Sequence, residues 1–204
     1  MIRTVGIVSL SRGLLGEPFM QHEAALGLSR LQAYGLRVKF LPHARGGLDA
    51  LRRHPEWRAE DLLQAFRDPE IDLILCAIGG DDTYRLAPYL FETGELQRAV
   101  TQKPFLGFSD TTIDHFMLRK VGLPTFYGQA FLPDVCELSR TMLPYTRQYF
   151  EELLTTGRIR CIRPSDTVYE SRKDFGESQL GTPLAAKKLG GFRLLQGGGQ
   201  FSGE

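Results

Sequence analysis

The apolar segment at residues 71–78, IDLILCAI, constrains the fold most. A strand that is apolar on both faces is typical of a parallel sheet covered by helices on both sides. Shorter strand-like runs lie at residues 5–10, 36–41, 104–108 and 123–127, with helix-like segments between them. We expect those helices at 19–34, at 58–67, directly after Thr83, at 110–121 and around 145–154. The alternation predicts an α/β fold with a mostly parallel sheet and helices on both faces.

The composition of the sequence changes after Gly157. Residues 158–191 are polar, basic and interrupted by proline and glycine, which is typical of a linker with at most one short strand, at 158–162. Residues 192–196 could form one strand of a second domain. We therefore expect an N-terminal α/β domain at 1–157, followed at 158–204 by a linker and the start of a second, incomplete domain.

Composition narrows the function classes. The 204 residues carry 25 Lys and Arg against 24 Asp and Glu, so no basic surplus indicates a nucleic-acid or membrane-surface partner. No apolar run approaches the roughly 20 residues of a membrane helix, and the N-terminus lacks signal-peptide features. Three cysteines without CxxC spacing fit reduced thiols in the cytoplasm. No HExxH, HxxxH or Cys/His cluster predicts a metal site.

Ligands of open parallel sheets bind beyond the carboxyl ends of the strands, so three loops matter. The first, residues 9–16, lacks the spacing of a dinucleotide or phosphate-binding motif. The second runs from Gly79 through Gly80, Asp81 and Asp82 to Thr83. Its glycines permit a tight turn, its helix-start N–H groups can hold an oxyanion or carboxylate, and its hydroxyl would project from the sheet edge. Alternatively, Asp82 or Thr83 simply caps the helix.

The third loop contains Ser109 and Asp110, before the helix that carries His115. Either residue could cap that helix, but the loop would also lie beside Thr83, so a contact with substrate is the alternative. A hydroxyl nucleophile needs a base within hydrogen-bond reach. The chain has four histidines, and no pattern assigns one of them to Thr83.

Three segments together resemble the LD-carboxypeptidase family of serine peptidases: RAEDLLQAFRDPEIDLILCAIGG, AIGGDDTYRLAPYL and KPFLGFSDTTIDHFMLRKVGLPTFYG. The resemblance covers essentially residues 1–204 and is nearest to the microcin C immunity branch. It implies an N-terminal domain with a nucleophilic serine after its GG pair, and a C-terminal domain that supplies the glutamate and histidine of a Ser-His-Glu triad. It further implies a homodimer, and no metal or organic cofactor.

The resemblance also implies an activity. Members cleave an amide bond next to a free carboxylate, either before the terminal D-alanine of a murein tetrapeptide or between an aminoacyl group and a nucleotide-like moiety. The implied partners are therefore a small peptide or an aminoacyl-nucleotide. Carried over to this sequence, the nucleophile position is Thr83, the oxyanion would be held by backbone N–H groups of Gly80 and Tyr84, and the substrate would meet Gly79, Asp82, Ser109 and Asp110.

The sequence departs from the family pattern in two ways, and both bear on whether we expect this chain to be active. Threonine stands where most members have serine, and its extra methyl group stiffens χ1 and crowds the turn. The family's glutamate and histidine would fall after residue 204, and Glu204 is not the catalytic glutamate. We therefore expect a truncated chain that is inactive alone. The alternative is a non-catalytic homologue that binds a small ligand or peptide.

Overall fold

The computed structural model describes residues 2–191, 193, 195 and 197. Its centre is a five-stranded parallel sheet in the order β2-β1-β3-β4-β5. These strands are β1 (Thr4–Val8), β2 (Arg37–Phe40), β3 (Leu73–Cys76), β4 (Phe105–Gly107) and β5 (Phe126–Tyr127). Every residue of β1, β3 and β4 is buried, as expected for strands covered on both faces. The α/β fold with a parallel sheet is confirmed.

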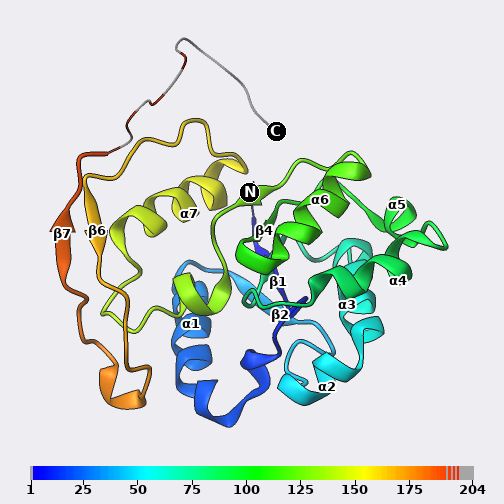
Figure 1. Ribbon diagram of the computed structural model, residues 1–204, viewed down its shortest axis with the longest axis horizontal. Coiled ribbons are helices and arrows are strands. Elements are labelled where there is room, and N and C mark those ends of the chain that lie inside the picture. Colours follow the sequence, from blue (N-terminus) through cyan, green and yellow to red (C-terminus); the bar gives the residue numbers. More distant parts are fainter. Residues whose placement is uncertain (1, 192, 194, 196, 198–204) are drawn as a thin grey trace.

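Helices cover both faces of the sheet (Figure 1). The connection from β1 runs to β2 at one side, whereas β3, β4 and β5 follow at the other side. Right-handed crossovers therefore place α1 on one face and α3 to α6 on the opposite face. The helices are α1 (Gln21–Ala33), α2 (Leu48–Arg53), α3 (Pro55–Arg67), α4 (Ala87–Phe91), α5 (Glu95–Ala99), α6 (Thr112–Lys120) and α7 (Pro144–Thr156).

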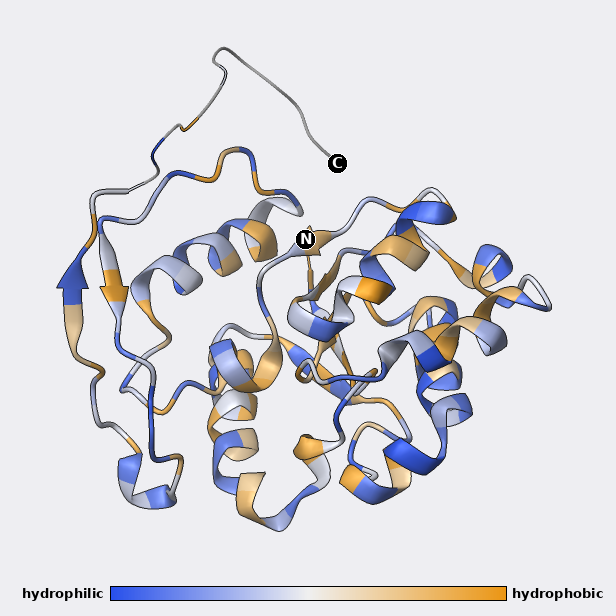
Figure 2. Ribbon diagram, in the orientation of Figure 1, coloured by the Kyte–Doolittle hydropathy of each residue, from blue (hydrophilic) through white to orange (hydrophobic). Residues whose placement is uncertain are grey.

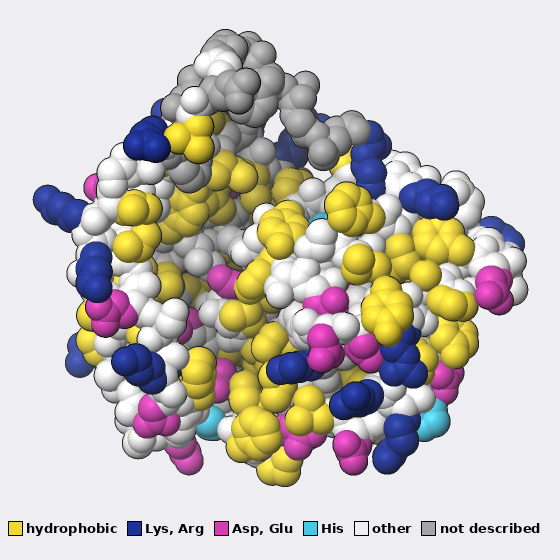
Figure 3. Space-filling view, viewed as in Figure 1, with side chains coloured by type: hydrophobic (Ala, Val, Ile, Leu, Met, Phe, Trp, Pro, Cys, Tyr) yellow, Lys and Arg dark blue, Asp and Glu magenta, His cyan; other side chains and the backbone are white. Residues whose placement is uncertain are grey.

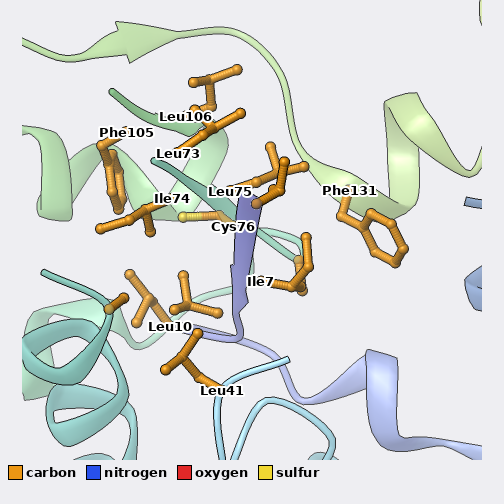
Figure 4. Close-up of a cluster of buried hydrophobic side chains, with 14 of the residues drawn as sticks. Ile7, Leu10, Leu41, Leu73, Ile74, Leu75, Cys76, Phe105, Leu106 and Phe131 are labelled. Carbon is orange, nitrogen blue, oxygen red and sulfur yellow. The ribbon is translucent and has the colours of Figure 1, made fainter. Parts of the chain in front are cut away.

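The hydrophobic core lies on the two faces of this sheet. Ile7 and Leu75 from the central strands, Phe105 from β4 and Phe131 from a turn of π-helix (Phe131–Val135) are fully buried and surround the sheet in Figure 4. Figure 2 shows that hydrophobic and hydrophilic residues alternate along the helices, whereas the central strands are largely hydrophobic. The helix expected at 58–67 follows this pattern, because its apolar residues pack against the sheet.

Several local expectations need correction. The strand expected at 158–162 is wrong, since that segment has no strand. Side chains of α7 bind backbone donors in and just after this segment: the N–H of Arg160 donates to Glu152, and that of Arg163 donates to Tyr149. The pairing strands lie further along, as an antiparallel pair of β6 (Thr167–Tyr169) and β7 (Ala186–Lys188). Of the strand expected at 192–196, positions 192, 194 and 196 lie outside the described residues.

Helix α7 ends at Gly157, which has the left-handed φ of +69° that favours glycine at this position.

The division of the chain into domains at 157 and 158 stays a prediction. Over the residues that the structure describes, no helix is long and apolar enough to cross a membrane.

Candidate active site

The candidate site lies where the carboxyl ends of β1, β3 and β4 meet. The strand order reverses between β1 and β3, which makes this edge the topological switch point where ligands of such sheets bind. Gly79 and Gly80 follow β3 and pass between the other two loops. A Cβ atom on Gly80 would lie 2.1 Å from the Oγ of Ser11, and one on Gly79 would lie 3.0 Å from the Cβ of Ser109. Only glycine fits this close approach.

Asp110 joins all three loops. Its Oδ2 accepts hydrogen bonds from the hydroxyls of Ser11 and Thr83, both at 2.6 Å, and from the backbone N–H groups of Asp82 and Thr83, both at 3.0 Å. Burial alone would raise the pKa of the Asp110 carboxyl, but these hydrogen bonds outweigh it and hold the pKa below its usual value. Asp110 is therefore a carboxylate that fixes the turn after β3. It does not cap α6, which was the alternative reading.

Thr83 is brought into the site, but its hydroxyl does not project outward as expected. The side chain is fully buried, and its Oγ1 donates toward the Asp110 carboxylate, with the carbonyl of Leu10 at 3.4 Å. The exposed hydroxyl-bearing residue at this edge is Ser109. Ser109 is exposed and has φ of +63°, and it is the one non-glycine residue with positive φ in the described part of the chain. Such a backbone is strained and clusters at functional sites.

Arg58 is a functional neighbour that the sequence reasoning missed. Its fully buried guanidinium holds both carboxylate oxygens of Asp82, at 2.7 and 3.2 Å, and donates to the carbonyls of Leu10 and Ser11. The carboxylate of Asp82 therefore points into the protein and caps no helix. One signal could have found the pair: Arg58 lies on the buried face of an amphipathic helix, where an arginine needs a partner.

The remaining predicted residues lie at the same edge. Tyr84 is the second residue of a turn of 3-10 helix (Thr83–Leu86) and is 63% exposed. Its N–H belongs to the first turn, where such groups lack helical partners and can hold an anion. Gly80 lies against Ser11 and Arg12. The assignment of the oxyanion site to Gly80 and Tyr84 stays a prediction.

His115 lies on α6, the helix that follows the loop of Ser109 and Asp110, and both of its ring nitrogens have hydrogen-bond partners within the fold. Its Nε2 lies 3.0 Å from the carbonyl of Gly107 and its Nδ1 lies 2.6 Å from the hydroxyl of Thr125. Burial lowers the pKa of the imidazole, so the ring is neutral. With both nitrogens engaged, His115 cannot serve as the base for Thr83. No group of three or more potential metal ligands occurs among the residues that the structure describes.

A buried acid lies one helical turn beyond Asp110. Asp114 is fully buried on α6, and neither of its carboxyl oxygens has a hydrogen-bond partner in the described structure. Burial, reinforced by the charge of Asp110, raises the pKa of Asp114 well above its usual value. The folded protein therefore keeps this acid protonated at a pH where the unfolded chain releases the proton.

This proton linkage gives a testable stability effect. Because the unfolded state binds fewer protons, the free energy of unfolding falls as the pH rises above the unfolded pKa of 3.8. Asp114→Asn removes this contribution, so the wild type should lose up to about 1.4 kcal/mol per pH unit more than the variant. Urea unfolding at pH 5 and pH 8 measures the difference, with the exposed Asp49→Asn as control. Equal slopes for wild type and Asp114→Asn would contradict the protonated state.

The fold and the site together define a class. A doubly wound α/β domain that carries a hydroxyl residue on a strand-turn-helix segment at its switch point is typical of hydrolases. Comparison with known families gives the narrower result. Residues 5–128 match the LD-carboxypeptidase N-terminal domain, and the chain belongs to this family of peptidases.

Individual relatives agree with the family. The murein tetrapeptide carboxypeptidase of Pseudomonas aeruginosa is 33% identical over 132 residues, which is 65% of this chain and 41% of the relative. The microcin C7 self-immunity protein MccF of Escherichia coli is 32% identical over 99 residues, which is 48% of this chain and 28% of the relative. The matches thus span less than half of these curated relatives.

Solved structures extend the match. An MccF-like protein from Streptococcus pneumoniae, solved in complex with AMP, has a TM-score of 0.96 and 59% identity. The alignment covers 97% of this chain and 58% of that protein. An MccF-like protein from Bacillus anthracis has a TM-score of 0.72 and 26% identity, with 93% of this chain and 54% of that protein covered. The chain therefore spans little more than half the length of these structural relatives.

Proposed function

We propose that this chain is the nucleophile-bearing part of a hydrolase that cleaves an amide bond next to a free carboxylate, with Thr83 as the attacking group. One observation carries the proposal. The hydroxyl of Thr83 lies 2.6 Å from the ionised Asp110, in a turn that three loops hold at the switch point of the sheet. Family membership supports the reaction class, because the family consists of peptidases.

The proposed substrate class is an aminoacyl-nucleotide conjugate. The Streptococcus pneumoniae relative was solved with AMP, and its 59% identity exceeds that of the murein carboxypeptidase. A murein tetrapeptide, as in peptidoglycan recycling, is the second substrate to test. A cytoplasmic location and a homodimer belong to the same proposal and rest on composition and on the family resemblance.

The proposed reaction has two stages. The Oγ1 of Thr83 attacks the carbonyl carbon, the C–N bond breaks, and the amine leaves with a proton while an ester forms on Thr83. Water then hydrolyses the ester and releases the carboxylic acid. Asp110 is a poor base because four hydrogen bonds stabilise its charged form, so its role is to position the turn and the hydroxyl. In this proposal the base comes from a second domain, as the family resemblance implies.

The burial of Thr83 also favours a second candidate. The hydroxyl has to turn from Asp110 toward the substrate before it can attack, and a β-branched side chain does so less readily than serine. A homologue that keeps the ligand site without turnover would have this geometry. Calorimetric binding of aminoacyl sulfamoyl adenosine without hydrolysis, in a protein with both domains, would favour this non-catalytic alternative.

A chimera tests the hydrolase proposal. This chain is joined to the part of the Streptococcus pneumoniae relative that lies beyond the matched region, and hydrolysis of aminoacyl sulfamoyl adenosine and of a murein tetrapeptide is followed by chromatography. We expect turnover of the nucleotide conjugate by the chimera and none by this chain alone. A folded chimera that cleaves neither substrate, even as Thr83→Ser, would contradict the proposal.

A further inference from the structure

An apolar cavity of about 510 Å³ opens beside the carboxyl end of β3. It touches the candidate site through Ile78, the residue directly before Gly79. Hydrophobic side chains gather on the surface over the segment that leads into α1, as Figure 3 shows. The lining consists of Leu14, Phe19, Met20, Glu23, Ile78, Leu132, Pro133, Phe175 and Gly176, and we call this cavity the Glu23 pocket.

Glu23 is the one ionisable residue in this lining. It lies on the buried face of α1, is 4% exposed, and its Oε1 has no hydrogen-bond partner in the described structure. Burial raises the pKa of its carboxyl group, and the charge of Glu137 adds to the effect. The other buried residues of α1 are Ala24, Gly27 and Leu31, so Glu23 is the only charged side chain on this buried face.

The two basic residues near Glu23 have other hydrogen-bond partners. The Nε2 of His22 lies 2.8 Å from the carbonyl of Phe175. Arg172 pairs with Glu137 at 2.5 Å and donates to the carbonyl of Thr182. Both influence Glu23 through space, but neither hydrogen-bonds to it in the described structure. The carboxyl group therefore faces an apolar cavity without a direct counter-ion.

We propose that the Glu23 pocket binds an apolar group that carries a protonated amine, with Glu23 as its counter-ion. If the proposed function holds, this group is the side chain of the aminoacyl part of the substrate, since the pocket adjoins the turn that carries Thr83. The apolar walls bury the stem of the ligand and offer no donor that competes for the carboxylate. Charge-assisted hydrogen bonds gain strength where apolar walls lower the local dielectric.

The chemistry of the lining selects against other ligands. An anionic group would be repelled by Glu23 and would find no cation in the walls. A neutral apolar group would fill the cavity and leave the buried carboxyl group unpartnered, which is costly. The volume is adequate, because a cavity of about 150 Å³ already holds benzene. An amine on an aliphatic or aromatic stem packs its stem against the apolar walls and pairs its charge with the Glu23 carboxylate.

Binding of phenethylamine and phenethyl alcohol to the full chain tests the proposal. The two probes share one stem and differ in the charged group. NMR titration should show that the amine binds at least about tenfold more tightly than the alcohol. Glu23→Gln should abolish that preference and leave the affinity for the alcohol unchanged, whereas the exposed Glu92→Gln should retain it. Equal binding of the two probes to the wild type would overturn the proposal even if the Glu23 variant failed to fold.

A second measurement separates this inference from the proposed function. In the chimera, lysyl and norleucyl sulfamoyl adenosine differ only by the terminal amine, and kcat/KM for the lysyl compound should be at least about tenfold higher. Turnover of both at equal rates would keep the hydrolase and remove the amine selectivity. Amine binding to this chain, together with an inactive chimera, would keep the pocket and remove the hydrolase.

Discussion

Replacing Arg58 with methionine should lower the free energy of unfolding by about 3–5 kcal/mol, the range found when one partner of a buried ion pair is removed. The guanidinium is fully buried and binds both oxygens of Asp82 as well as two backbone carbonyls. Methionine keeps much of the volume, so the loss arises from the unsatisfied carbonyls and from an Asp82 carboxylate whose remaining partner is the partly exposed Arg85, at 3.1 Å. Urea denaturation at pH 7 measures the change.

Two further variants make this prediction specific. Asp82→Asn added to Arg58→Met removes a charge that has lost its buried partner and keeps only Arg85, so the double variant should recover part of the lost stability. Arg53→Met changes an exposed arginine of α2 and should stay within about 0.5 kcal/mol of the wild type. If Arg58→Met were no more harmful than Arg53→Met, the ion pair would not hold the turn.

The second large effect concerns Thr83 in the chimera. Thr83→Ala should lower kcat by about 10³-fold or more, because removal of a hydroxyl nucleophile leaves only binding and oxyanion stabilisation. Thr83→Ser should retain turnover and raise kcat, because serine lacks the methyl group that stiffens χ1 and turns more readily away from Asp110. Steady-state hydrolysis of aminoacyl sulfamoyl adenosine measures both variants.

Ser109→Ala is the matched control. Ser109 carries the exposed hydroxyl at the same edge, and its loss should change kcat by less than about tenfold if it only lines the site. A loss as large as that of Thr83→Ala would assign the attack to Ser109.

The sheet could be predicted because its strands carry local signals. An unbroken apolar run such as Leu73–Cys76 requires cover on both faces, and the helices between the strands then fix the parallel order. The loops of the site followed from the strand ends. These signals are contained in short windows of sequence, so no long-range contact had to be known.

The interior of the site could not be predicted for the opposite reason. Ser11 and Asp110 hydrogen-bond across 99 positions of the sequence, and Arg58 reaches Asp82 across 24. Nothing local distinguishes a capping aspartate from one that crosses to a neighbouring loop, and both appear as an acid before a helix. The strand expected at 158–162 was wrong for the same reason. Side chains of α7, which no local pattern reveals, bind backbone N–H groups in and just after that segment.

If the turn after β3 carries the nucleophile on Thr83, the covalent intermediate of the reaction must form on that residue, and peptide mapping can locate it. The chimera is quenched in acid during turnover of aminoacyl sulfamoyl adenosine and digested with trypsin. Thr83 then lies in the peptide of residues 68–85, whereas Ser109 lies in that of residues 99–119. We expect an aminoacyl adduct on peptide 68–85 that is absent from Thr83→Ala. An adduct on peptide 99–119, or turnover that survives in Thr83→Ala, would contradict it.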